Sequence, residues 1–136
     1  MKIGFTCGTF DFLHAGHVLM LKEAKKQCDY LIVGLQVDPS IDRPDKHKSI
    51  ESLLERQIKL RACKFVDDII VYETEEDQIT LLRVLDINVR IVGIDHKNDI
   101  SLKAEARKCI CIERGIETYY NRRDHNYSSS AIREKI

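Results

Sequence analysis

The stretch IGFTCGTFDFLHAGH, residues 3–17, decides how the chain begins to fold. Its apolar run from Ile3 to Cys7 predicts a strand, and the turn Gly8-Thr9-Phe10-Asp11 ends that strand. A helix that begins near His14 places His14 and His17 three residues apart, on one face of its first turn. That turn also carries unpaired backbone N–H groups and the positive end of the helix dipole, and Gly16 leaves the backbone bare there. We therefore predict a phosphate-binding strand, turn and helix.

Four more apolar runs follow, and a stretch with helical spacing separates each run from the next. The predicted strands are 3–7, 30–37, 68–72, 89–93 and 116–120. The predicted helices are 17–27, 50–63, 77–85 and 102–114, with a short helix capped by Ser128 or Ser129 at the end. Alternating strands and helices, with strands apolar on both faces, are typical of a parallel sheet covered on both sides. We predict a single α/β domain over residues 1–136, a three-layer Rossmann-like fold with a five-stranded parallel sheet.

The same spacing predicts which helical side chains face the sheet. In the first helix the expected inward residues are Val18, Leu21 and Ala24, and in the second they are Leu53, Leu54, Ile58 and Leu60.

Polar residues follow four of the five predicted strands. The segments are 8–17, 36–48, 93–98 and 122–130. Because the carboxyl ends of parallel strands share one edge, and ligands bind there near the point where strand order reverses, we expect these segments to meet around one site.

Composition excludes several classes of function. Basic and acidic residues balance at 22 each, so no overall field attracts nucleic acid or an acidic membrane surface. No apolar stretch approaches the roughly 20 residues that cross a bilayer. Five irregularly spaced cysteines and no apolar leader favour free thiols in a reducing compartment. We predict a cytoplasmic protein that binds neither nucleic acid nor membrane.

The motifs Gly8-Thr9-Phe10-Asp11 and His14-Ala15-Gly16-His17 resemble the opening of the HxGH nucleotidyltransferase superfamily. Within it the chain is most similar to the cytidylyltransferase family, above all the glycerol-3-phosphate type. The resemblance continues through Glu55-Arg56, the segments 65–70 and 92–95, and Arg123 with Ser128-Ser129-Ser130. It thus covers nearly the whole chain and implies the nucleotidyltransferase fold and a homodimer.

The resemblance implies a set of nucleotide-binding residues: Gly8, Thr9, Phe10, His14, Gly16, His17, Arg56, Gly93, Arg123, Ser128, Ser129 and Ser130. Among these it gives His14, His17 and Arg123 catalytic roles, together with a lysine from the loop 38–48. Lys46 is our first choice for that lysine, and Lys48 stays open because the loop differs by one residue from the family pattern. Asp11, Asp95 and His96 are the implied acceptor-binding residues; His96 stands where relatives carry a tryptophan.

These residue types suit transfer of a nucleotidyl group. The attacking phosphate is already ionised near neutral pH, its second pKa being about 6, so charge stabilisation rather than a general base is required. Histidine, with an ordinary pKa near 6.5, can become cationic beside phosphates, and we expect at least one ring to be protonated in the transition state.

By resemblance the reaction transfers CMP from CTP to a small phosphomonoester, glycerol 3-phosphate first, giving CDP-glycerol and pyrophosphate. Two alternatives stay open: an adenylyltransferase that uses ATP and a sugar phosphate of the heptose type, and a nucleotide-sensing domain without turnover. Mg²⁺ is expected to accompany the triphosphate, without a metal site built by the protein.

Overall fold

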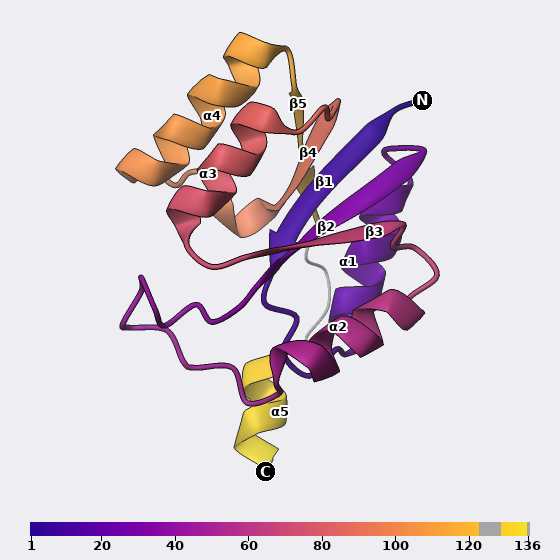
Figure 1. The fold of residues 1–136 in the computed structure, drawn as a ribbon, viewed down its shortest axis with the longest axis vertical. Coiled ribbons are helices and arrows are strands. Elements are labelled where there is room, and N and C mark those ends of the chain that lie inside the picture. The colour runs from indigo at the N-terminus through magenta and orange to yellow at the C-terminus, as the bar shows by residue number, and fades with distance from the viewer. Residues whose placement is uncertain (123–128, 136) are drawn as a thin grey trace.

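The computed structural model describes residues 1–122 and 129–135 (Figure 1). All five strands run parallel in one sheet, in the order β3-β2-β1-β4-β5. They are β1 (Ile3–Gly8), β2 (Tyr30–Gln36), β3 (Asp68–Tyr72), β4 (Val89–Gly93) and β5 (Glu117–Asn121). The helices are α1 (Ala15–Lys25), α2 (Leu53–Ala62), α3 (Glu75–Val84), α4 (Leu102–Arg114) and α5 (Ser129–Lys135), and a 3₁₀ turn, η1, covers Ile94–His96. The predicted α/β fold with a five-stranded parallel sheet is confirmed.

Helices α1 and α2 cover one face of the sheet, and α3 and α4 cover the other (Figure 1). Each face has its own apolar core, because successive strand residues point to opposite faces. The α1/α2 core includes Leu21, Leu31, Val33, Leu60, Val89 and Ile91. The α3/α4 core includes Phe5, Ile79, Leu82, Ile110 and Ile116.

Local signals fix the helix starts. Ser52 and Glu55 form a reciprocal capping box at α2, and Thr74 and Asp77 form another at α3. Helix α4 begins after Ser101 and ends at Gly115, whose φ of 67° is a left-handed conformation that favours glycine. Among the described residues, no helix combines the length and the apolar character needed to traverse a bilayer.

The predicted inward faces of two helices need correction. Leu54 and Ile58 are 66% and 60% exposed, and Val18 lies at the edge of its helix at 36%. The inward positions of α2 are instead Leu53, Arg56 and Leu60, where Arg56 is 2% exposed. Arg56 lies between Leu53 and Leu60 on the side of α2 that faces the sheet. Leu54 and Ile58 therefore lie on the opposite, exposed side.

Strand order reverses between β1 and β4, whose carboxyl ends lie side by side. The segments that follow β1, β2 and β4 leave the sheet at this edge, and α5 lies beyond it (Figure 1). This is the place where α/β sheets of this kind bind ligands.

Candidate functional site

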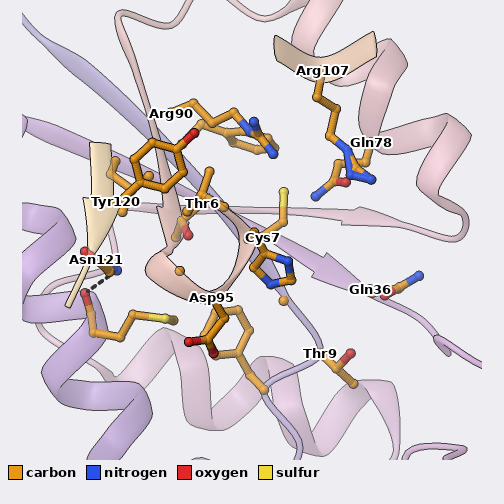
Figure 2. Close-up of a pocket in the computed structure, with 18 of the residues that line it drawn as sticks. Thr6, Cys7, Thr9, Gln36, Gln78, Arg90, Asp95, Arg107, Tyr120 and Asn121 are labelled. Atoms are coloured by element: carbon orange, nitrogen blue, oxygen red, sulfur yellow. Dashed lines mark hydrogen bonds between the residues drawn. The ribbon is translucent and has the colours of Figure 1, made fainter. Parts of the chain in front are cut away.

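A cavity of about 470 Å³ opens at the carboxyl edge of the sheet (Figure 2). Its walls come from the turn after β1, the start of α1, the ends of β2, β4 and β5, and the inner sides of α3 and α4. Of the predicted site residues, it is lined by Gly8, Thr9, Phe10, His14, Gly16, His17, Gly93, Asp95 and His96. The predicted meeting of separate segments at one edge is therefore confirmed for the described residues.

His14 and His17 cap each other at the start of α1. The backbone N–H of His17 donates to Nδ1 of His14, and the backbone N–H of His14 donates to Nδ1 of His17, both at 3.3 Å. The two rings stack with centroids 3.8 Å apart and planes 20° from parallel. Because each Nδ1 accepts a hydrogen bond, the proton of each neutral ring is on Nε2, at the end of the ring away from the backbone. The pair thus presents two N–H groups that can donate to one anion.

The turn before these histidines is held in an uncommon backbone conformation. Phe10 and Phe12 both have a φ of 52°, in the left-handed region that non-glycine residues seldom adopt. The Phe10 ring is 3% exposed, and its centroid lies 5.2 Å from that of His17. A Cβ on Gly8 would lie 2.9 Å from Cε2 of Phe10, so the ring occupies the space that any larger residue would need. The surrounding packing keeps the turn in this shape.

Asp11 lies behind this turn, outside the cavity lining, at 2% exposed. Its carboxylate accepts the N–H groups of Ile50 and Glu51 at 3.0 Å each, and Arg133 of α5 at 2.7 Å. Burial raises the pKa of Asp11, but these donors outweigh burial and hold the pKa below its usual value. Glu51 in return accepts the N–H of Phe12 at 2.6 Å. The structure thus shows Asp11 linking this turn to the residues before α2 and to α5, and its contact with the acceptor stays a prediction.

Arg56 also lies outside the cavity lining. Its guanidinium donates to four backbone carbonyls: Gln36 at 2.6 Å, Val37 at 2.5 Å, Thr9 at 3.0 Å and Glu51 at 3.2 Å. Burial lowers the pKa of this group, and the carboxylates of Asp11, Asp38 and Glu51 oppose that shift. Since its donors tie the ends of β1 and β2 to the residues before α2, Arg56 holds the turn after β1 from behind, and its own contact with a nucleotide stays a prediction.

The loop after β2 contributes Arg43 to the cavity, whereas Lys46 and Lys48 are exposed and lie outside the lining. Arg43 donates from Nη2 to Oε1 of Gln36 at 3.1 Å, and its Nε lies 3.4 Å from Oε1 of Glu75. The sequence prediction did not include Arg43, although it lies in the same loop as Lys46 and Lys48, because the resembled family uses a lysine from this loop. The remaining predicted residues include Arg123 and Ser128, which lie outside the described residues, and Ser129 and Ser130, which lie in the first turn of α5.

Two arginines that the sequence reading missed face the cavity from the α3/α4 side of the sheet (Figure 2). Arg90 lies in β4, and Arg107 lies in α4 with its side chain 11% exposed. The sequence does carry a signal for Arg90, because a charged residue interrupts the apolar run Val89-Arg90-Ile91-Val92 of a predicted strand. The described lining has five cationic side chains, Arg43, Arg90, Arg107, Lys108 and Arg122, and three carboxylates, Glu75, Asp95 and Asp99.

Within the described part of the chain, no three or more His, Cys, Asp or Glu side chains gather as metal ligands would. All five cysteines are free thiols, and burial raises the pKa of Cys7 to about 11. The excess of cationic over acidic side chains in the described lining suits an anionic ligand.

Comparison with known proteins agrees with this geometry. A family model described as "Cytidylyltransferase-like" matches residues 5–135. The bifunctional protein HldE of Helicobacter pylori (strain ATCC 700392 / 26695) is 38% identical over 136 residues, which cover 99% of this chain and 28% of that protein. HldE of Campylobacter jejuni subsp. jejuni serotype O:6 (strain 81116 / NCTC 11828) is 35% identical over 105 residues, which cover 76% of this chain and 23% of that protein. The chain thus spans about a quarter of the length of these relatives.

Among solved structures, the lipopolysaccharide core biosynthesis protein from Thermoplasma volcanium GSS1 is similar over nearly its whole length. The TM-score is 0.72 at 29% identity, and the match covers 91% of this chain and 99% of that one.

Proposed function

Because the chain belongs to the cytidylyltransferase-like family, we propose that it is a nucleotidyltransferase. A phosphate oxygen of a phosphomonoester forms a bond to the α-phosphorus of a nucleoside triphosphate. The bond from that phosphorus to the bridging oxygen of the β-phosphate breaks, and pyrophosphate leaves. No general base is needed, since the attacking phosphate is already ionised near neutral pH. The protein's task is to hold two polyanions in line and to stabilise the charge on the oxygens.

The stacked histidine pair is the observation that carries this proposal. The two rings stack at the start of a helix with each Nδ1 accepting a backbone N–H, and the helix dipole there also favours anions. In our proposal both rings donate to phosphate oxygens in their neutral form. This revises the expectation of a protonated ring, because protonation at Nδ1 would remove the acceptor that caps the neighbouring backbone N–H.

Other residues would contribute positive charge or hydrogen-bond donors to the triphosphate. The cavity lining includes Arg43 and Arg122. By family resemblance, the further proposed contacts are Arg123, Lys46 or Lys48, and the hydroxyls of the serines 128–130. Gly93 and Thr9 border the cavity beside the nucleotide, and Asp95 and His96 remain the proposed acceptor contacts.

Mg²⁺ would arrive with the triphosphate. The described lining carries three carboxylates, Glu75, Asp95 and Asp99, but no three possible ligands gather among the described residues. The described residues therefore fit an ion held mainly by phosphate oxygens and water, which is common for Mg²⁺. Bound in this way, the ion would neutralise charge on the pyrophosphate as it leaves.

Two substrate pairs remain proposals. The first is CTP with glycerol 3-phosphate, and the second is ATP with a sugar phosphate of the heptose type. Similarity to the bifunctional protein HldE and to a lipopolysaccharide core biosynthesis protein supports the second pair. The family model alone, described as cytidylyltransferase-like, does not decide between the two.

Pyrophosphate release tests the proposal and separates the two pairs. The protein is mixed with Mg²⁺, either CTP or ATP, and a panel that contains glycerol 3-phosphate and several sugar phosphates. We expect release with one triphosphate and one class of acceptor. Triphosphate binding without release under every condition would favour the nucleotide-sensing alternative.

We also propose that the chain forms a homodimer. The side chains of Ile50, Leu54 and Ile58 lie four residues apart and are exposed, which gives α2 and the residues before it an apolar outer surface. Sedimentation equilibrium of the wild type and of Leu54→Glu tests whether a second copy covers that surface. A monomeric mass for the wild type at high concentration would contradict the proposal.

A further inference from the structure

The α3/α4 face of the sheet changes from apolar to polar along the strands. Toward their amino ends, Phe5 and Ile32 belong to the apolar cluster that α3 and α4 cover. Toward their carboxyl ends, the same face lines the cavity with Cys7, Gln36, Tyr72 and Tyr120, and Arg90 lines the cavity level with its register partner Phe5. Gln78 of α3 and Arg107 of α4 close this part of the cavity from above (Figure 2). We call it the inner lobe. Gln36 already pairs with Arg43 and with the carbonyl of Glu73, whereas the buried Nε of Arg107 has no acceptor among the described residues, and a polar ligand can supply one.

Arg90 gives the inner lobe a positive charge that the described residues do not neutralise. It lies in β4 between β1 and β5, and no described carboxylate forms an ion pair with it. Burial lowers the pKa of its guanidinium, which shows that the surroundings penalise the charge. A partly buried cation without a counter-ion is costly, so its presence in an inner strand favours a negatively charged ligand.

Arg107 adds to this charge. Its Nη2 lies 3.9 Å from Glu75, and its buried Nε meets no hydrogen-bond acceptor among the described residues. Glu75 also lies within ion-pair distance of Arg43 and Lys103, at 3.4 Å each. Lys103 in turn lies 3.8 Å from Asp42, so two carboxylates face these three cations and one positive charge is left over beside Arg90.

The strand register separates this charge from the phosphate-binding turn. Arg90 is paired with Phe5, three residues before Gly8, which is about 10 Å along the strand. The phosphate that attacks the nucleotide has to lie at the turn, next to His14 and His17. A group in contact with Arg90 is therefore a different part of the acceptor.

We propose that the inner lobe binds the acceptor and that Arg90 and Arg107 hold a second anionic group, a carboxylate or a phosphate, at the end remote from the reacting phosphate. This inference rests on the proposed function for the identity of the ligand as acceptor. Gln78, Tyr72 and Tyr120 supply amide and phenol groups that can hydrogen-bond to hydroxyls between the two anionic ends.

Binding without nucleotide tests this proposal separately from catalysis. Isothermal titration compares glycerol 3-phosphate with 3-phosphoglycerate, which adds a carboxylate, and glucose 1-phosphate with glucose 1,6-bisphosphate, which adds a phosphate. We expect at least one of the two-anion probes to bind the wild type about tenfold or more tightly than its one-anion partner, since hydrogen bonds to charged groups are the strong ones. The preferred member of the panel then identifies the group as carboxylate or phosphate.

Arg90→Met and Arg107→Met should abolish that preference, whereas Arg61→Met on the exposed side of α2 should keep it. Thermal unfolding without ligand provides a second readout. If Arg90 is an uncompensated cation, the melting temperature of ligand-free Arg90→Met should equal or exceed that of the wild type. If Arg90 instead stabilises the fold, the melting temperature should fall.

Equal affinity for one-anion and two-anion probes in the wild type would overturn the proposal, as would the preference surviving in Arg90→Met. Failure of pyrophosphate release in the presence of a bound two-anion probe would instead count against the proposed function and leave this inference standing.

Discussion

His14 and His17 act as a pair because each ring caps the backbone of the other. Capping by histidine is unusual, since Ser, Thr, Asp and Asn are the residues that commonly cap helices. The unusual choice has a chemical benefit: both Nδ1 atoms are used inside the protein, and both Nε2–H groups are oriented together.

His17→Ala should lower the turnover rate at least about a hundredfold, the effect of losing one preorganised donor to a charged transition state. The fold should survive, because loss of one cap costs only about 1 kcal/mol. Steady-state pyrophosphate release measures the rate, and circular dichroism checks folding. His47→Ala, a change in the exposed part of the loop, is the matched control. Turnover close to wild type in folded His17→Ala would remove the histidine pair from the mechanism.

Gly8 is constrained by the ring of Phe10 rather than by its own backbone. Gly8→Ala places a Cβ 2.9 Å from Cε2 of a ring that is 3% exposed, so the ring has to move. We expect the free energy of unfolding to fall by about 1–3 kcal/mol, as for other overpacked sites. Gly93→Ala is the control for stability, since its Cβ would meet only Cδ2 of His96, at an ordinary 3.6 Å. Urea unfolding compares the two; equal losses of stability would show that the contact with Phe10 is not the cause.

At the scale of elements, α2 shows how a functional sequence departs from a simple apolar pattern. Arg56 occupies an inward position and donates to carbonyls of three segments behind the cavity: Thr9 after β1, Gln36 and Val37 at the end of β2, and Glu51 before α2. The helix therefore serves as a support for the ends of β1 and β2, in addition to covering the sheet.

Arg56→Lys should lower the free energy of unfolding by about 3 kcal/mol, because one ammonium cannot reach four separate carbonyls and buried acceptors lose their donors. Turnover should fall as well, since Thr9 loses its anchor. Urea unfolding with Arg61→Lys as the exposed control on the same helix provides the measurement. An Arg56→Lys midpoint equal to that of the control would contradict this role.

The elements could be predicted from the sequence far better than the site could. The alternation of runs such as 89–93 with helical stretches placed all five strands within about one residue at most ends, because burial on both faces leaves a strong pattern. On the predicted inward face of α2, Leu53 and Leu60 are confirmed and Leu54 and Ile58 are wrong, because a pattern of apolar residues cannot anticipate a buried arginine. Asp11 and Arg56 both belong to sequence motifs, but the contacts that each makes come from far along the chain. Asp11 accepts the N–H of Ile50, 39 residues away, and Arg56 donates to the carbonyl of Thr9, 47 residues away. Such contacts are set only by the tertiary fold.

At the scale of the whole molecule, Asp11 joins the turn after β1, the residues before α2, and Arg133 of α5. Its pKa lies below the ordinary value, so the carboxylate stabilises the fold fully above the unfolded pKa of about 3.9, and this contribution is lost as the pH falls through the lowered, folded-state pKa.

Asp11→Asn should therefore be less stable than wild type by about 2 kcal/mol at neutral pH. Its free energy of unfolding should also fall less than that of the wild type between about pH 5 and about pH 2. Urea titrations across this range, with the exposed Asp45→Asn as control, measure both effects. Identical acid limbs for wild type and Asp11→Asn would show that this carboxylate does not contribute to the acid dependence.

The proposed function depends on the paired histidines binding a triphosphate at the edge of the cavity. A crystal structure of the protein with Mg²⁺ and a non-hydrolysable analogue of ATP or CTP would show whether they do. We expect the phosphates to lie at the start of α1, within hydrogen-bond distance of Nε2 of both His14 and His17. A triphosphate bound elsewhere, or histidine rings turned away from it, would refute the proposal.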